Sequence, residues 1–200
     1  MKAVRFLRRR PVAIKIYIDQ GHNPQSPNSG AEGNGFYEQD LTYAIGLLLY
    51  DQLMANGNFD VRLSRPTPDT VLGRNNSTSL SERVREANEF GADVFISLHT
   101  NAAENRLASG SEALIYSEGS RVSYGLAEDI LKNLNLTTGL RNRGIIERPG
   151  LYVLRFTGMP AVLVEMGFIS NRYDAELMAY SPELFSEGIY RGIVEYYGVS

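Results

Sequence analysis

The run Val94-Phe95-Ile96-Ser97-Leu98-His99-Thr100-Asn101 decides the fold that this sequence predicts. Its first five residues are almost continuously apolar, as expected of a strand buried on both faces of a sheet. Further strands are predicted at 12–19, 59–63, 111–116, 151–155 and 161–165. Helical patterns alternate with them, at 38–55, from 79 to about 91, and at 119–134, 172–179 and 182–197. This alternation predicts a single α/β domain whose sheet is covered by helices on both faces.

Two helix boundaries have recognisable signals. Gly57 follows the apolar periodicity of 38–55 and predicts the end of that helix. Ser79-Leu80-Ser81-Glu82 has the spacing of a capping box and predicts the start of the next helix. Between the first strand and the first helix, 20–37 forms a loop rich in Gly, Asn, Pro and Ser. That loop is too long for a simple connection, which suggests a functional role.

The composition limits the possible functions. Two hundred residues with 43% hydrophobic and 22% charged residues are typical of one soluble globular domain. The net charge of −3 gives no basic field for nucleic acid. The sequence contains no cysteine, which excludes thiolate catalysis, cysteine-ligated zinc and disulfides.

The sequence also predicts how the chain divides into a tail and a domain. Residues 1–12 form a basic tail, and 13–200 form the catalytic domain. The tail lacks the apolar stretch of a signal peptide, and no run in the sequence is long enough to span a membrane. The tail is interpreted as a solvated, poorly ordered chain end, and the alternative is weak attachment to an anionic wall or membrane.

Both histidines of the chain follow strand-like runs and are flanked by small or polar residues. His22 follows the first strand, and His99 ends the apolar part of the 94–101 run. Loops at strand ends are where α/β proteins place their chemistry, and two histidines with one carboxylate form a common set of catalytic zinc ligands. Glu38, at the start of the first helix, is the best candidate for the carboxylate, ahead of Glu32 and Asp40. The alternative is that both histidines are structural.

A third candidate residue, Glu165, ends a run of four apolar residues. An unpaired carboxylate in such a strand would be costly. One interpretation is a buried ion pair with a residue such as Arg155. The other is a general base with a shifted pKa that faces a metal-activated water.

Several blocks of the chain, in order, resemble the catalytic domain of the zinc-dependent N-acetylmuramoyl-L-alanine amidases, the amidase 3 class. The resemblance runs from about Ile14 to Tyr197. It rests on Asp19-Gln20-Gly21-His22, Glu38-Gln39-Asp40, Ser79-Leu80-Ser81-Glu82-Arg83, Ile96-Ser97-Leu98-His99-Thr100-Asn101, Leu151-Tyr152-Val153-Leu154-Arg155 and Pro160-Ala161-Val162-Leu163-Val164-Glu165-Met166-Gly167-Phe168-Ile169-Ser170-Asn171. One departure is Asn23-Pro24, where the family usually has a glycine pair.

The resemblance implies a mixed, mainly parallel sheet flanked by helices and a single catalytic Zn²⁺. It places the zinc ligands on His22, Glu38 and His99 and the catalytic glutamate on Glu165. Asp19 and Asn101 are candidates to orient the two histidines. The implied reaction is hydrolysis of the peptidoglycan amide between N-acetylmuramic acid and L-alanine, as in an autolysin.

The implied location is extracytoplasmic, either secreted or in the cell wall. Because no wall-binding domain is recognisable, a separate targeting protein or domain is a possible partner. Two other functions remain open from the residues alone: a zinc peptidase that cuts within the stem peptide, and a non-catalytic wall-binding module.

Overall fold

A computed structural model describes residues 13–199, so the basic tail predicted at 1–12 lies outside the described residues. Its centre is a six-stranded sheet with the strand order β4-β1-β5-β8-β6-β7. The strands are β1 (Ile14–Gln20), β4 (Phe59–Leu63), β5 (Val94–Asn101), β6 (Ser111–Ile115), β7 (Asn142–Glu147) and β8 (Ala161–Phe168). Neighbours pair in parallel except β6 and β8, which pair antiparallel. The mixed, mainly parallel sheet is therefore confirmed.

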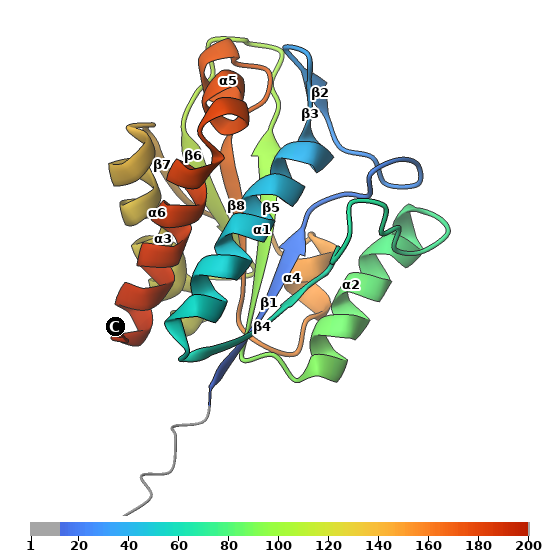
Figure 1. Cartoon of the computed structure of the whole chain (residues 1–200), viewed down its shortest axis with the longest axis vertical. Coiled ribbons are helices and arrows are strands. Elements are labelled where there is room, and N and C mark those ends of the chain that lie inside the picture. Colours follow the sequence, from blue (N-terminus) through green and yellow to red (C-terminus); the bar gives the residue numbers. More distant parts are fainter. Residues whose placement is uncertain (1–12, 200) are drawn as a thin grey trace, which may run out of the picture.

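Helices cover both faces of this sheet (Figure 1). They are α1 (Glu38–Asn56), α2 (Asn76–Phe90), α3 (Arg121–Thr138), α4 (Tyr152–Phe156), α5 (Arg172–Tyr180) and α6 (Pro182–Tyr197). The helices α1, α3 and α6 pack on one face, whereas α2 and α4 pack on the other. Alternate residues of β1 show this division, because Ile16 and Ile18 belong to the first core and Tyr17 to the second.

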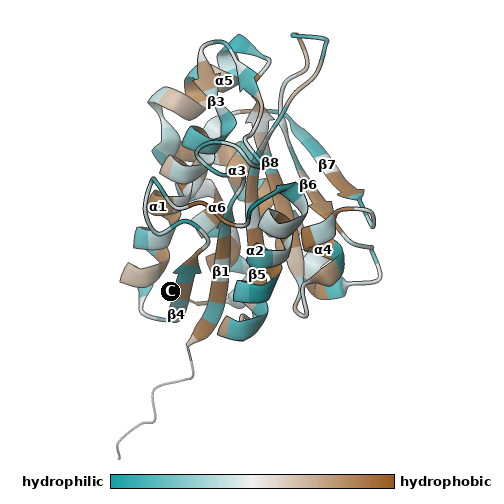
Figure 2. Ribbon diagram, turned by 90° about the vertical axis from the view of Figure 1, so that its right-hand side faces the viewer, coloured by the Kyte–Doolittle hydropathy of each residue, from teal (hydrophilic) through white to brown (hydrophobic). Residues whose placement is uncertain are grey.

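Burial explains why the central strands are so apolar. In Figure 2, β1 and β5 are brown between helices of mixed colour, as expected of strands covered on two sides. The residues Val94 to Leu98 are all buried. Because β1, β5 and β8 pair in parallel, their carboxyl ends meet at one edge of the sheet. The candidate residues lie at this edge.

Three parts of the secondary-structure prediction need correction. The helix α2 begins at Asn76, before the predicted Ser79 box, because Asn75 and Thr78 form the capping box through reciprocal side-chain to backbone hydrogen bonds. The run predicted as a strand at 151–155 is instead the short helix α4, which packs against α2. A short apolar run does not by itself distinguish strand from helix.

The third correction is β7, which was not predicted. The loop 20–37 also contains a small hairpin of β2 (Glu32–Gly33) and β3 (Phe36–Tyr37). Across residues 13–199, none of the helices combines the length and apolarity needed to cross a membrane.

Candidate metal centre

His22, Glu38 and His99 meet at the carboxyl edge of the sheet, from three different elements. His22 lies two residues beyond β1, Glu38 is the first residue of α1, and His99 lies near the end of β5. Their ligand-type atoms all lie within 4.8 Å of one another. Glu38 is the common partner, because His22 Nε2 lies 3.2 Å from its Oε2 and His99 Nδ1 lies 3.1 Å from its Oε1.

Backbone groups hold the Glu38 carboxylate in place. Its Oε2 accepts a hydrogen bond from the Ala31 N–H at 2.9 Å, and its Oε1 accepts one from the Thr100 N–H at 2.9 Å. The side chain thereby joins the His22 loop to strand β5. Neither competitor joins the cluster: Glu32 and Asp40 are both exposed.

The cluster is electrostatically coupled. Burial favours a raised pKa for Glu38, but hydrogen bonds and charge interactions with His22 and His99 hold that pKa well below its usual range. Burial opposes the charged form of His99, yet the hydrogen bond and charge of Glu38 raise the pKa of the imidazole above its usual value. The site therefore contains a fixed negative charge that attracts a cation.

Two glycines give the cluster its close packing. A Cβ atom at Gly21 would lie 2.6 Å from the His99 imidazole, and one at Gly30 would lie 2.9 Å from Glu38 Oε2. These positions tolerate no side chain without displacing the donors. The sequence signal was the small residues beside the histidines, although it did not identify Gly30.

Glu165 lies beside this cluster on β8, with its Cα paired in register with that of His99. Its Oε2 is buried without a hydrogen-bond partner. Burial raises the pKa of Glu165 to about 7. The charge of His99 opposes this shift, whereas the negative charges of Glu38 and Glu112 add to it. The alternative ion pair with Arg155 does not occur among residues 13–199, where Arg155 instead lies over the Phe156 ring.

The residues expected to orient the histidines contact other groups. Asp19 binds Arg83 and accepts a hydrogen bond from Ser97 Oγ at 2.8 Å. Asn101 donates to Glu112 Oε1 at 2.8 Å. In the described part of the chain, neither Asp19 nor Asn101 forms a hydrogen bond with the His22 or His99 imidazole, so any orienting effect on the two rings is indirect.

A small cavity adjoins the cluster. It has a volume of about 110 Å³ and is lined by His22, His99, Leu80, Tyr152 and other residues of α2, α4 and the sheet. A larger cavity of about 750 Å³ lies at the β4 edge and includes none of the clustered residues. The small cavity therefore reaches the two imidazoles from the side of α4, whereas neither Glu38 nor Glu165 lines it.

The donor set fits a zinc ion. Two imidazoles and one carboxylate are a known catalytic set that leaves a coordination position open. The buried Nδ1 atom of His22 has no hydrogen-bond partner, and the two glycines leave room at the donors. No cysteine competes as a ligand in this sequence.

Metal affinity is expected to fall as the pH falls. At and below pH 6.5 the raised pKa of His99 keeps its imidazole protonated in the metal-free protein. A metal must displace that proton, so binding releases protons and strengthens as the pH rises. Zinc titrations by calorimetry at pH 5.5, 6.5 and 7.5, each in two buffers of different ionisation enthalpy, measure both effects. Equal affinity at all three pH values would contradict this expectation.

The fold and the clustered donors together define a class, the α/β domains with a candidate metal site at the carboxyl edge of a mainly parallel sheet. The family model for N-acetylmuramoyl-L-alanine amidase matches residues 16–195. The chain therefore belongs to the N-acetylmuramoyl-L-alanine amidase family, whose members are peptidoglycan hydrolases.

Individual relatives agree with this assignment. The chain is 35% identical to N-acetylmuramoyl-L-alanine amidase LytC of Bacillus subtilis over 98% of its own length, but it spans only 38% of that relative. An N-acetylmuramoyl-L-alanine amidase from Clostridium difficile 630 is 30% identical, with a TM-score of 0.84 over 94% of this chain and 98% of the other. The CwlD amidase of Clostridioides difficile, solved in complex with the GerS lipoprotein, is 26% identical, with a TM-score of 0.80 over 94% of this chain and 100% of the other.

Proposed function

We propose that this chain hydrolyses the amide bond between N-acetylmuramic acid and L-alanine in peptidoglycan. In this proposal His22, Glu38 and His99 hold one zinc ion, and Glu165 is the catalytic general base. Family membership supports the bond that is cleaved. The observation that carries the residue roles is the buried Oε2 atom of Glu165, which has no hydrogen-bond partner, on a residue in register with His99.

The chemistry follows from the positions of these groups. Zinc supplies Lewis acidity, which polarises a scissile carbonyl and makes water a better nucleophile at neutral pH. Glu165 accepts a proton from the attacking water and then delivers it to the departing L-alanine nitrogen. Burial raises the pKa of Glu165 to about 7 in the metal-free protein, and burial makes the carboxylate a better proton acceptor than an exposed glutamate.

Backbone groups around the cluster hold the Glu38 carboxylate in place. Glu38 is fixed by the Ala31 and Thr100 backbone, so its carboxylate stays between the two imidazoles. Such preorganisation reduces the rearrangement needed during the reaction.

The substrate implies where the protein acts. Peptidoglycan lies outside the cytoplasm, so we place the activity there, in the wall or after secretion. The complex of CwlD with the GerS lipoprotein supports a separate protein as a possible partner. A peptidase that cuts within the stem peptide would use the same metal donors, but the family match favours the amidase.

Digestion of purified peptidoglycan tests the proposal. The zinc-loaded protein is expected to release intact stem peptides with new L-alanine amino termini, identified by mass spectrometry. Protein stripped with a chelator should release none, and restored zinc should recover the activity. Cleavage within the stem would instead identify a peptidase, and wall binding without cleavage by the zinc-loaded protein would identify a binding module.

A further inference from the structure

Arg83 is enclosed beneath the loop that carries His22. The side chain comes from α2, and the residue is only 1% exposed. Removing a guanidinium from water is costly unless a countercharge and hydrogen bonds compensate it. Asp19 provides the countercharge through its contact with Arg83 Nη1, and Ser97 on β5 binds the second oxygen of Asp19.

The guanidinium also binds the backbone of the His22 loop. Its Nη1 donates to the Gln20 carbonyl at 2.9 Å, and its Nη2 donates to the His22 carbonyl at 2.8 Å. The same Nη2 lies 3.2 Å from Asn23 Oδ1. These three contacts pair guanidinium N–H groups that the ion pair with Asp19 leaves free, and two of them fix carbonyls of the His22 loop.

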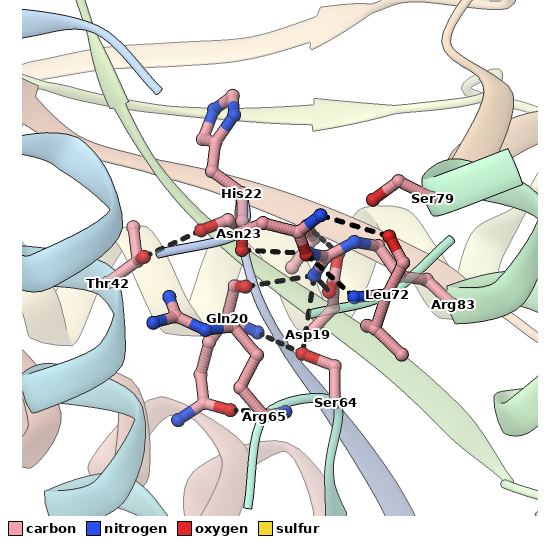
Figure 3. Close-up of polar contacts among 12 residues, drawn as sticks. Asp19, Gln20, His22, Asn23, Thr42, Ser64, Arg65, Leu72, Ser79 and Arg83 are labelled. Atoms are coloured by element: carbon pink, nitrogen blue, oxygen red, sulfur yellow. Dashed lines mark hydrogen bonds and ion pairs between the residues drawn. The ribbon is translucent and has the colours of Figure 1, made fainter. Parts of the chain in front are cut away.

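The backbone at His22 needs such support. Its φ angle of 68° lies in the left-handed region, which is unfavourable for a residue with a side chain. Thr42 Oγ1 holds the intervening Gly21 carbonyl at 2.9 Å, so the carbonyls of residues 20, 21 and 22 are all bound. Figure 3 shows the His22 imidazole pointing away from this network while its backbone lies against it.

Asn23 extends the support to the rest of the loop. Its side-chain amide donates to the Pro27 carbonyl at 2.7 Å and the Leu72 carbonyl at 2.9 Å. Its Oδ1 accepts from the Leu72 N–H at 3.0 Å, beside the contact with Arg83. The guanidinium therefore contacts the chain on both sides of His22, at the Gln20 carbonyl and at the Asn23 side chain.

We propose that Arg83 is a positioning residue of the metal centre, whose guanidinium holds the backbone of His22 in the conformation that turns its imidazole toward Glu38. This inference rests on the proposed function, because it assigns His22 as a metal ligand. Lysine could keep the charge beside Asp19, but an ammonium group lacks the planar fork that reaches two carbonyls at once.

Two variants separate positioning from charge balance. Arg83→Lys keeps the positive charge, whereas the double variant Asp19→Asn/Arg83→Met removes both charges of the buried pair. Replacing a buried ion pair with uncharged groups is often tolerated in stability. Both variants are expected to lose about 10–100-fold in zinc affinity, as residues that support metal ligands typically do. The kcat should fall by at least as much as any change in KM.

Zinc affinity is measured by competition with a chromophoric chelator, and folding by circular dichroism and thermal unfolding. Hydrogen exchange of residues 20–28 in the metal-free protein gives a second readout, and faster exchange is expected in both variants. Leu131→Ala is the control, because truncating this buried residue destabilises the protein and its helix α3 packs against α6, β6, β7 and β8. Its zinc affinity and its exchange at 20–28 should match those of the wild type.

Wild-type zinc affinity in either folded variant, together with unchanged exchange at 20–28, would overturn the role of Arg83. If the double variant does not fold, Arg83→Lys still decides. If the wild type binds no zinc, the proposed function fails instead. The exchange measurement then still shows whether Arg83 fixes the His22 turn.

Discussion

Replacing Glu165 with glutamine is expected to reduce kcat by roughly 10²–10⁴-fold, the usual contribution of a general base. Glutamine has nearly the same shape but cannot accept the proton from the attacking water. KM and zinc affinity should change little, because Glu165 is not one of the three clustered donors. Steady-state kinetics on purified peptidoglycan fragments, with zinc content measured in the same samples, give all three quantities.

Glu112→Gln is the matched control for this variant. Glu112 pairs in register with Glu165 from the neighbouring strand β6, so its carboxyl group lies on the same face of the sheet. Its oxygens already accept hydrogen bonds from Asn101 and Arg143 at 2.8 Å and 2.9 Å. The loss of kcat should therefore be much smaller. Comparable losses in the two variants would contradict the assignment of Glu165 as the base.

The same glutamine should stabilise the metal-free protein at high pH. Burial raises the pKa of Glu165 from 4.5 to about 7, so the ionised carboxylate opposes folding once the pH exceeds 4.5. That cost grows between pH 4.5 and 7 and then stays constant, at up to about 3 kcal/mol. Urea unfolding should show Glu165→Gln more stable than the wild type at pH 8.5 and nearly equal to it at pH 4.5. Equal stability at both pH values would contradict the raised pKa.

The elements predicted correctly are those with a clear local signal in the sequence, either a continuous apolar run or a glycine at a helix end. Strand β5 is buried on both faces and reads as a continuous apolar run. The ends of α1 and α2 coincide with Gly57 and Gly91, which adopt the left-handed conformation typical of helix ends. Strand β7 lies at the sheet edge and its residues are exposed or half-buried, so its sequence has no continuous apolar run that would predict a strand.

The site was predictable to a similar degree. The positions of His22 and His99 at strand ends pointed to one edge of the sheet. Glu38 at a helix start and Glu165 at the end of an apolar run were candidates from the residues, and the resemblance to a known family agreed with both. The role proposed for Arg83 could not be predicted, because its partners include backbone carbonyls that lie 61 and 63 residues earlier in the chain. A signal did exist: Arg83 occupies the buried face of α2 with Ser79 and Ala87, where arginine is unusual.

Replacing Glu38 with glutamine should have the largest effect on metal binding. Glutamine removes the negative charge between His22 and His99 and leaves one acceptor oxygen where two are used. Its amide N–H₂ must then face either the Ala31 or the Thr100 N–H, so one buried donor loses its partner. We expect zinc affinity to fall by more than the roughly 10–100-fold typical of residues that only support metal ligands. Activity should be lost with it.

The same loss of a hydrogen bond should lower the free energy of unfolding of the metal-free protein by about 1–3 kcal/mol. Zinc competition titration and urea unfolding measure the two effects separately. Glu32→Gln and Asp40→Asn are the controls, because both carboxylates are near in sequence yet exposed. Asp40 also shares the first turn of α1, so its variant accounts for the loss of a negative charge at a helix start. Zinc affinity within tenfold of the wild type in Glu38→Gln, or a comparable loss in Glu32→Gln, would move the carboxylate ligand away from Glu38.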